Sequence, residues 1–173
     1  MTPKKTDILK AAIELFSKNG YKETSTKKIS EVAGVSEGLL FRHYQNKEGI
    51  LTAVLNFCKT EIETHLQPVF KYEHPKVLLK HLIAIPLHIP NPQKKLWNLL
   101  YQLRMQNHTH LQSIFDLIYP YLEKAFNFLH CEDAKVESDL VILFLDAAIC
   151  KSCREENNQL YMVVDSLNHK FDI

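Results

Sequence analysis

The sequence has few cysteines, few glycines and no long uncharged apolar run. Its four cysteines in 173 residues are too few for the disulfide scaffold of a small secreted protein. No apolar run approaches the ~18 residues that a membrane-spanning helix needs. The N-terminal segment also lacks the apolar core of a signal peptide. We therefore expect a soluble, cytoplasmic protein that has no membrane partner.

Signals for β-strands are also nearly absent. Apolar and polar residues never alternate for long, and the hairpin-type pair Asn-Gly occurs only at Asn19-Gly20. Apolar residues instead recur with the 3.6-residue period of helices. Prolines and helix-capping residues separate the periodic segments. The pattern predicts an all-α protein of about nine helices, with three short ones followed by longer ones.

The first three predicted helices form a recognisable unit. They have about 15, 8 and 8 residues, and a tight turn at Gly34 separates the second from the third. Glycine tolerates the positive φ that such a turn requires. Either Ser25 or Thr26 can cap the second helix, while Ser36 can cap the third and Asn46 the fourth. The lengths and the turn predict a helix-turn-helix, whose third helix enters the major groove of DNA.

The same segment is rich in positive charge. Residues 1–50 hold nine Lys/Arg and six Asp/Glu, a net charge of +3, whereas the remainder carries −2. Five side chains that can carry positive charge lie near the starts of the second and fourth helices or on the third: Lys27, Lys28, Arg42, His43 and Lys47. Because helix N-termini also favour phosphate, the segment predicts a DNA-binding surface.

The residue pattern of this segment is also typical of one protein family. Residues 8–51 contain, in order, the steps AIELFSKNGY, STKKIS, AGVS and KEGIL. They resemble the N-terminal segment of the TetR/AcrR-type bacterial transcriptional regulators. The departures are small, since Ser30 stands where Ala is commoner and Leu39 where Ser or Thr is frequent.

The resemblance implies a helix-turn-helix DNA-binding domain at residues 1–46 and an all-helical effector-binding and dimerisation domain at 47–173. It implies a repressor that binds double-stranded DNA at a palindromic operator as a homodimer, uses no cofactor, and leaves the DNA when a small hydrophobic effector binds. Twelve residues are implied to contact DNA: Ser25, Thr26, Lys27, Lys28, Ser36, Glu37, Gly38, Leu39, Phe41, Arg42, His43 and Lys47.

Aromatic residues gather in the middle of the chain. Most must pack in the core, but small-molecule pockets are lined by such residues as well. We hypothesise that six residues line the effector cavity: Trp97, Tyr101, Met105, Phe115, Tyr119 and Phe144. The last two predicted helices carry apolar stripes that fit either the core of one chain or the seam of a dimer.

The sequence also bears on three other functions. An enzyme is disfavoured because the sequence has no G-x-S-x-G, phosphate-binding loop or metalloprotease motif. An all-α protein-interaction bundle without DNA binding would leave the grouped cations unexplained. Cys150 and Cys153 have CxxC spacing, which fits either core packing or a thiol- or metal-sensing regulator. Because no second cysteine pair and no metal-binding histidine spacing accompany them, we expect no metal site.

Overall fold

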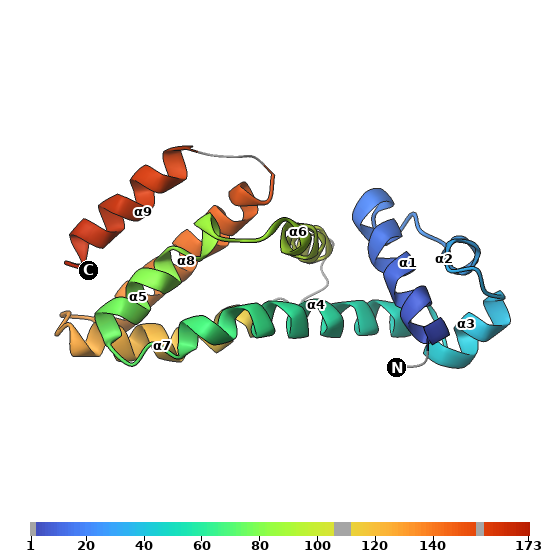
Figure 1. Cartoon of the computed structure of the whole chain (residues 1–173), viewed down its shortest axis with the longest axis horizontal. Coiled ribbons are helices and arrows are strands. Elements are labelled where there is room, and N and C mark those ends of the chain that lie inside the picture. The colour runs from blue at the N-terminus through green and yellow to red at the C-terminus, as the bar shows by residue number, and fades with distance from the viewer. Residues whose placement is uncertain (1–2, 106–111, 155–157) are drawn as a thin grey trace.

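The computed structural model describes residues 3–105, 112–154 and 158–173, with the side chains of 105, 112, 113 and 158 excepted. In these ranges the protein is all-helical, as the sequence predicted (Figure 1). Its elements are α1 (Pro3–Asn19), α2 (Thr26–Val32), α3 (Glu37–Tyr44), α4 (Lys47–Phe70), α5 (Pro75–Ile83), the 3₁₀ turn η1 (Ile85–Leu87), α6 (Asn91–Met105), α7 (Gln112–Phe128), α8 (Ala134–Ser152) and α9 (Asn158–Lys170). None of these described helices is long and apolar enough to cross a membrane.

Side-chain caps set the starts of α2, α3 and α4. The side chains of Ser25, Ser36 and Asn46 each accept a hydrogen bond from the main-chain N–H three residues on, at 3.1, 3.2 and 2.7 Å. Each bond satisfies an N–H group that the first turn of a helix leaves without a partner. The predicted caps of α3 and α4 are therefore confirmed, and Ser25 rather than Thr26 caps α2.

The apolar faces of α1, α2 and α3 meet in one small core. Ile8 and Phe16 of α1, Ile29 of α2 and Leu40 of α3 are fully buried there. The turn between α2 and α3 has the predicted positive φ, +63° at Gly34. Only short turns connect these three helices. Burial of their apolar faces therefore fixes how α3 lies on α1.

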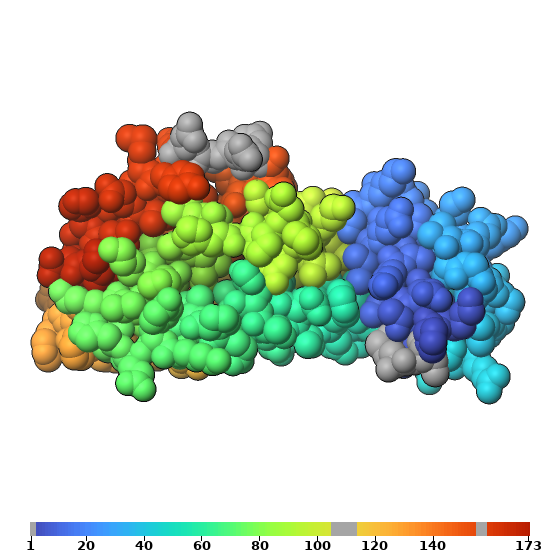
Figure 2. Space-filling view, viewed as in Figure 1, coloured from blue at the N-terminus to red at the C-terminus, as the bar shows by residue number. Residues whose placement is uncertain are grey.

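The 24-residue helix α4 connects the two ends of the molecule. It runs from α3, past α1 and α6, to α5 and α7 (Figure 1), and contacts all five. Figure 2 shows α1 to α3 forming one end of an elongated molecule and α5, α8 and α9 gathered toward the other. The predicted domain boundary at residue 47 thus falls at the first residue of a continuous helix that both parts share.

The larger part of the chain packs as a bundle of α5 to α9. The helix α7 lies between α5 and α8, and α9 covers α5. Ile118 and Phe126 of α7 and Val141 and Leu145 of α8 are fully buried. The ring of Phe171, just after α9, meets the ring of Phe126 edge to face with 4.9 Å between centroids. These contacts attach α9 to the bundle by its inner face.

The junction between α3 and α4 leaves no room for a side chain at Gly49. Gln45 takes a positive φ of 64°, and the N–H of Asn46 donates to the carbonyl of Tyr44 at 2.7 Å. A Cβ placed at Gly49 would overlap that same carbonyl oxygen. In contrast, a Cβ at Gly38 in α3 would have no atom within 4 Å. Packing, rather than local conformation, requires glycine at position 49.

We predict that Gly49→Ala lowers the free energy of unfolding by about 1–3 kcal/mol, because the added methyl forces the junction apart. Gly38→Ala is the matched control, and it should be neutral or stabilising by up to ~1 kcal/mol, because alanine is the better helix former. Urea unfolding followed by circular dichroism measures both values. Equal stability of the two variants would contradict the prediction.

Candidate nucleic-acid interface

The twelve residues predicted to contact DNA gather around the α2–α3 end of the molecule. Seven are exposed and five are half-buried. The exposed ones are Ser25, Lys27, Lys28, Ser36, Gly38, Phe41 and Arg42, and the half-buried ones are Thr26, Glu37, Leu39, His43 and Lys47. Leu40 and Tyr44 are the buried residues of α3. The helix therefore has an inward side at 40 and 44 and an outward side that includes Gly38, Phe41 and Arg42.

Tyr44 attaches the C-terminal end of α3 to α1. Its hydroxyl donates to the main-chain carbonyl of Lys5 at 2.8 Å, and the Lys5 ammonium lies 5.5 Å from the centre of its ring. Burial raises the pKa of the Tyr44 hydroxyl, so that it stays a donor. Sequence reasoning missed this residue, although its spacing of four from Leu40 places it on the buried side of the helix.

Thr26 and Glu37 join the first residues of α2 and α3. The Thr26 hydroxyl donates to Oε1 of Glu37 at 2.6 Å. A hydroxyl has a single hydrogen to donate, so in this conformation it is used by the carboxylate. The predicted contact of Thr26 with phosphate stays a prediction, and the partnership with Glu37 is an addition to it.

Lys47 lies against the loop that follows α1. Its Nζ donates to the carbonyl of Lys22 at 3.1 Å and sits 4.4 Å from the centre of the Tyr21 ring. The Tyr21 hydroxyl donates to Oε2 of Glu48 at 2.8 Å. Desolvation lowers the pKa of Lys47, while burial and the hydrogen bond to Glu48 raise the pKa of Tyr21 to about 12. These contacts anchor the start of α4, a role that the sequence did not indicate.

The remaining cations of the interface are more loosely held. Lys28 pairs with Glu31 at 3.6 Å, and both side chains are more than half exposed. Exposed pairs of this kind contribute only about 0–1 kcal/mol. Lys27 and Arg42 form no ion pair with any described residue. These three side chains can therefore turn toward an external anion at little cost.

The residues predicted to line an effector cavity have different surroundings. Trp97 is almost completely buried in the core, and Phe115 is half-buried against it. The hydroxyl of Tyr119 lies 3.5 Å from the carbonyl of Lys135. The side chain of Met105 lies outside the described part of the structure. The effector cavity thus stays a prediction.

Phe144, the sixth residue of that set, lines an apolar groove between α8 and α9. The groove has a volume of about 200 Å³. Its other lining residues include Ala147 of α8 and Leu160 and Val163 of α9. It is open to the surface formed by these two helices, so Phe144 lies at their seam.

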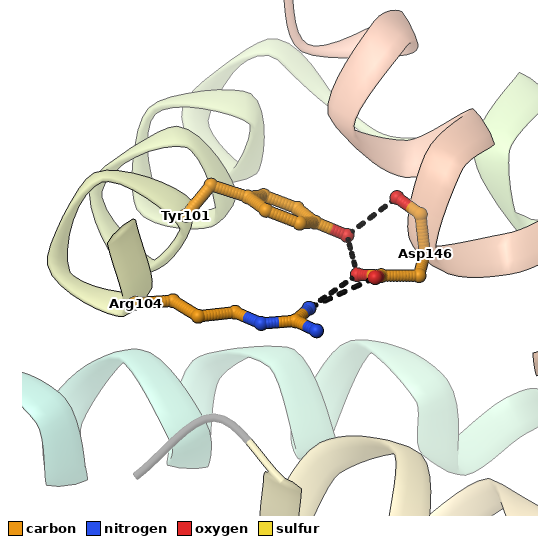
Figure 3. Close-up of polar contacts among 3 residues, drawn as sticks. All are labelled: Tyr101, Arg104 and Asp146. Carbon is orange, nitrogen blue, oxygen red and sulfur yellow. Dashed lines mark hydrogen bonds and ion pairs between the residues drawn. The ribbon is translucent and has the colours of Figure 1, made fainter. Parts of the chain in front are cut away.

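Tyr101 takes part in a polar contact between α6 and α8 (Figure 3). Its hydroxyl lies 2.8 Å from Oδ1 of Asp146 and 2.7 Å from the main-chain carbonyl of the same residue. Nη1 of Arg104 lies 2.8 and 2.9 Å from the two carboxylate oxygens. Burial and the hydrogen bond to Asp146 raise the pKa of Tyr101. The hydroxyl is satisfied inside the protein, and the contact fixes α6 on α8.

We predict that Asp146→Ala lowers the free energy of unfolding by about 1–3 kcal/mol, because the side-chain bonds of Tyr101 and Arg104 to the carboxylate are lost together. Asp165→Ala is the matched control, since that exposed side chain in α9 pairs only loosely with His169 at 3.8 Å. Its effect should be within ~0.5 kcal/mol. Urea unfolding measures both, and a loss at Asp146 no larger than at Asp165 would refute the prediction.

Of the CxxC pair, Cys153 packs against the hydrophobic core. Cys150 and Cys153 are free and half-buried. Desolvation raises the pKa of the Cys153 thiol to about 11, which leaves little of the reactive thiolate at neutral pH. The described residues also contain no group of three or more His, Cys, Asp or Glu suited to a metal ion. The geometry therefore gives no support to a thiol- or metal-sensing site here.

Comparison with known proteins assigns the N-terminal segment. Residues 8–54 match the family model described as bacterial regulatory proteins, tetR family. The uncharacterised HTH-type transcriptional regulator YvkB of Bacillus subtilis is 46% identical over 56 residues, 32% of this chain and 30% of that protein. The fatty acid metabolism regulator protein of the same organism is 38% identical over 52 residues, 30% of this chain and 27% of that protein. The matches thus span less than a third of these relatives.

Solved structures extend the likeness to the whole fold. A TetR-like transcriptional regulator from Rhodococcus sp. RHA1 superposes with a TM-score of 0.75 at 20% identity, covering 98% of this chain and 96% of that one. The regulator FadR from Bacillus subtilis, in complex with stearoyl-CoA, superposes with a TM-score of 0.70 at 18% identity, covering 96% of each chain. At this identity the likeness concerns the arrangement of the helices.

Proposed function

We propose that the chain is a cytoplasmic, DNA-binding transcriptional repressor, because its residues 8–54 match the tetR family of bacterial regulatory proteins and its relatives are transcriptional regulators rather than enzymes. One observation carries the proposal. The α2–α3 end presents Lys27, Lys28 and Arg42 outward, while Tyr44 and Thr26–Glu37 hold α3 at its two ends. A cationic surface on a firmly held helix is what reading of the major groove requires.

In this proposal α3 enters the major groove by its outward side. Arg42 donates hydrogen bonds to a base edge or a phosphate, and Phe41 provides an exposed apolar contact. Gly38 has no side chain to keep the backbone of the helix away from the bases. Lys27 and Lys28, in the first turn of α2, neutralise phosphates beside the groove.

We predict that Arg42→Ala weakens binding to a preferred duplex about 5- to 150-fold if Arg42 meets a base, as a loss of ~1–3 kcal/mol implies. Lys27→Ala should weaken binding to all sequences alike and lower the salt slope by about one. The duplex is one enriched by the wild-type protein from a randomised pool, and affinity is followed by fluorescence anisotropy between 50 and 200 mM salt, roughly the range where such contacts weaken.

Lys124→Ala is the matched control for these variants. Lys124 is an exposed lysine of α7, a helix that lies away from α2 and α3 (Figure 1). It should leave affinity and salt slope unchanged. Enrichment of no duplex by the wild type, or equal affinity of all three variants and the wild type, would overturn the proposal.

The proposed repressor is a homodimer built through α8 and α9. Both helices expose large apolar side chains: Leu140 and Leu143 on α8, and Tyr161, Met162 and Val163 on α9. Clusters of this kind mark interfaces, and the groove lined by Phe144 lies on the same surface. Pairing across this surface gives two α3 helices one DNA turn apart, ~34–36 Å, and therefore a palindromic operator.

We predict that Leu143→Glu, at a residue 69% exposed in the single chain, converts the dimer to a monomer. The reason is that a carboxylate buried in the seam without a partner costs several kcal/mol. Phe57→Glu, an equally drastic change at an exposed apolar residue of α4, is the control and should stay dimeric. Analytical ultracentrifugation distinguishes the two. A wild-type monomer, or a dimeric Leu143→Glu variant, would contradict the prediction.

Release by a small hydrophobic effector is the last part of the proposal. A fatty acid metabolism regulator among the relatives and a stearoyl-CoA complex among the structural neighbours support an apolar ligand. The helix α6 contacts α1 on one side and α8 on the other, where Tyr101 and Arg104 hold it on Asp146. An effector that displaces α6 would move α1 and, with it, the α2–α3 end that binds DNA. The α3 helices of both subunits must bind the operator together, so a change in the spacing between them lowers affinity for the operator.

A further inference from the structure

Glu37 is an acidic residue among the cations of the proposed DNA surface. It is the first residue of α3, half-buried, beside the exposed cations of α2. A carboxylate close to phosphates is repelled by them. Binding to the phosphate backbone therefore gives no reason for an acid at this position.

The carboxylate of Glu37 is held in place before any DNA arrives. Its Oε1 accepts the hydrogen bond of the Thr26 hydroxyl at 2.6 Å, across eleven residues of sequence. The Ser36 cap fixes the helical turn that carries it. The Glu37 carboxylate forms no other hydrogen bond with the described residues, so Oε2 can accept one. A side chain ordered in advance loses less entropy when it binds.

The next residue, Gly38, adds no side chain beside Glu37. Gly38 is exposed and has no side chain, and a Cβ there would meet no atom within 4 Å. The tip of α3 therefore combines a positioned acceptor with a neighbouring residue that has no side chain. Most hydrogen-bonding groups on the base edges of the major groove are acceptors. An acceptor on the protein therefore discriminates strongly against the bases that present them.

We infer that Glu37, positioned by Thr26, selects a cytosine in each half-site of the operator. Guanine offers the acceptors N7 and O6 and thymine the acceptor O4, all of which repel a carboxylate. Adenine has an N6 donor but also the acceptor N7 next to it. Cytosine presents its N4 amino group as a donor alone, and Glu accepts from it. The inference rests on the proposed DNA-binding function and adds the base that is read.

A purely structural role for Glu37 makes a different prediction. The bond to Thr26 ties α2 to α3, and an acid in the first turn of a helix is stabilised by its dipole. If that were its whole role, losing the carboxylate would lower stability and weaken binding to every sequence alike. Only a base-reading role changes the preference at one position of the operator.

The experiment is selection from a randomised pool of double-stranded DNA with the full-length wild type, Glu37→Gln, Thr26→Val and Thr26→Ser. The enriched duplexes are then compared by competition with all four base pairs at each position. The wild type should enrich a motif with a cytosine at one symmetric position, whose replacement lowers affinity about 5- to 150-fold. Glu37→Gln should lose that preference or move it to adenine, which glutamine reads through N6 and N7. All other positions of the motif should be unchanged.

The threonine variants test the positioning. Thr26→Val keeps the shape of the side chain and removes the hydroxyl, so the preference for cytosine should fall severalfold. Thr26→Ser keeps the hydroxyl and should retain it. Thermal unfolding by circular dichroism establishes that each variant is folded, and Thr26→Val still tests the inference if Glu37→Gln does not fold.

Two results overturn the inference, and they are distinguishable from failure of the proposed function. In the first, Glu37→Gln enriches the wild-type motif unchanged, or binds every duplex with equally lowered affinity. This result leaves the DNA-binding function in place and removes the base-reading role. Enrichment of no motif by the wild type removes both.

Discussion

Burial of one face of α4 holds the two parts of this protein together. Ile50, Val54 and Ile62 on that face are completely buried. The helices α1 and α3 pack at one end of α4, and α5 and α7 toward the other. Each such side chain contributes roughly 1.5–3 kcal/mol on burial, so the long helix is fixed firmly to both parts. The orientation of the DNA-facing end relative to the larger bundle depends on this helix more than on any single polar contact.

The recognition helix depends on that arrangement for its precision. With eight residues, α3 is too short to be stable alone in water. Its inward side, Leu40 and Tyr44, is held by α1, and its first residue, Glu37, is held by α2. The outward side can then carry residues chosen for binding, since the fold does not depend on them. This is why glycine, an exposed phenylalanine and an arginine can share it.

The region around α6 shows why residue type alone is a poor guide to a ligand site. Their residue types place Trp97 and Tyr101 in a predicted cavity because such residues line pockets, but the same residue types also fill cores. In the fold, Trp97 is buried, and the Tyr101 hydroxyl is bound to Asp146, 45 residues away in sequence. A pattern of aromatic residues is the same in both situations, because burial depends on what the neighbouring helices place opposite them.

The sequence by itself determined the all-helical architecture, the caps of α3 and α4 and the inward position of Leu40 on α3. Ser36 and Asn46 act on groups three residues away, and the 3.6-residue period assigns Leu40 to the inside, so local spacing contains the answer. Only the tertiary structure decided that Thr26 holds Glu37 and that Lys47 lies on Tyr21. Those contacts join separate elements, and their existence depends on how the helices cross. Crossing angles follow from the packing of whole faces, which the periodicity of any one segment does not specify.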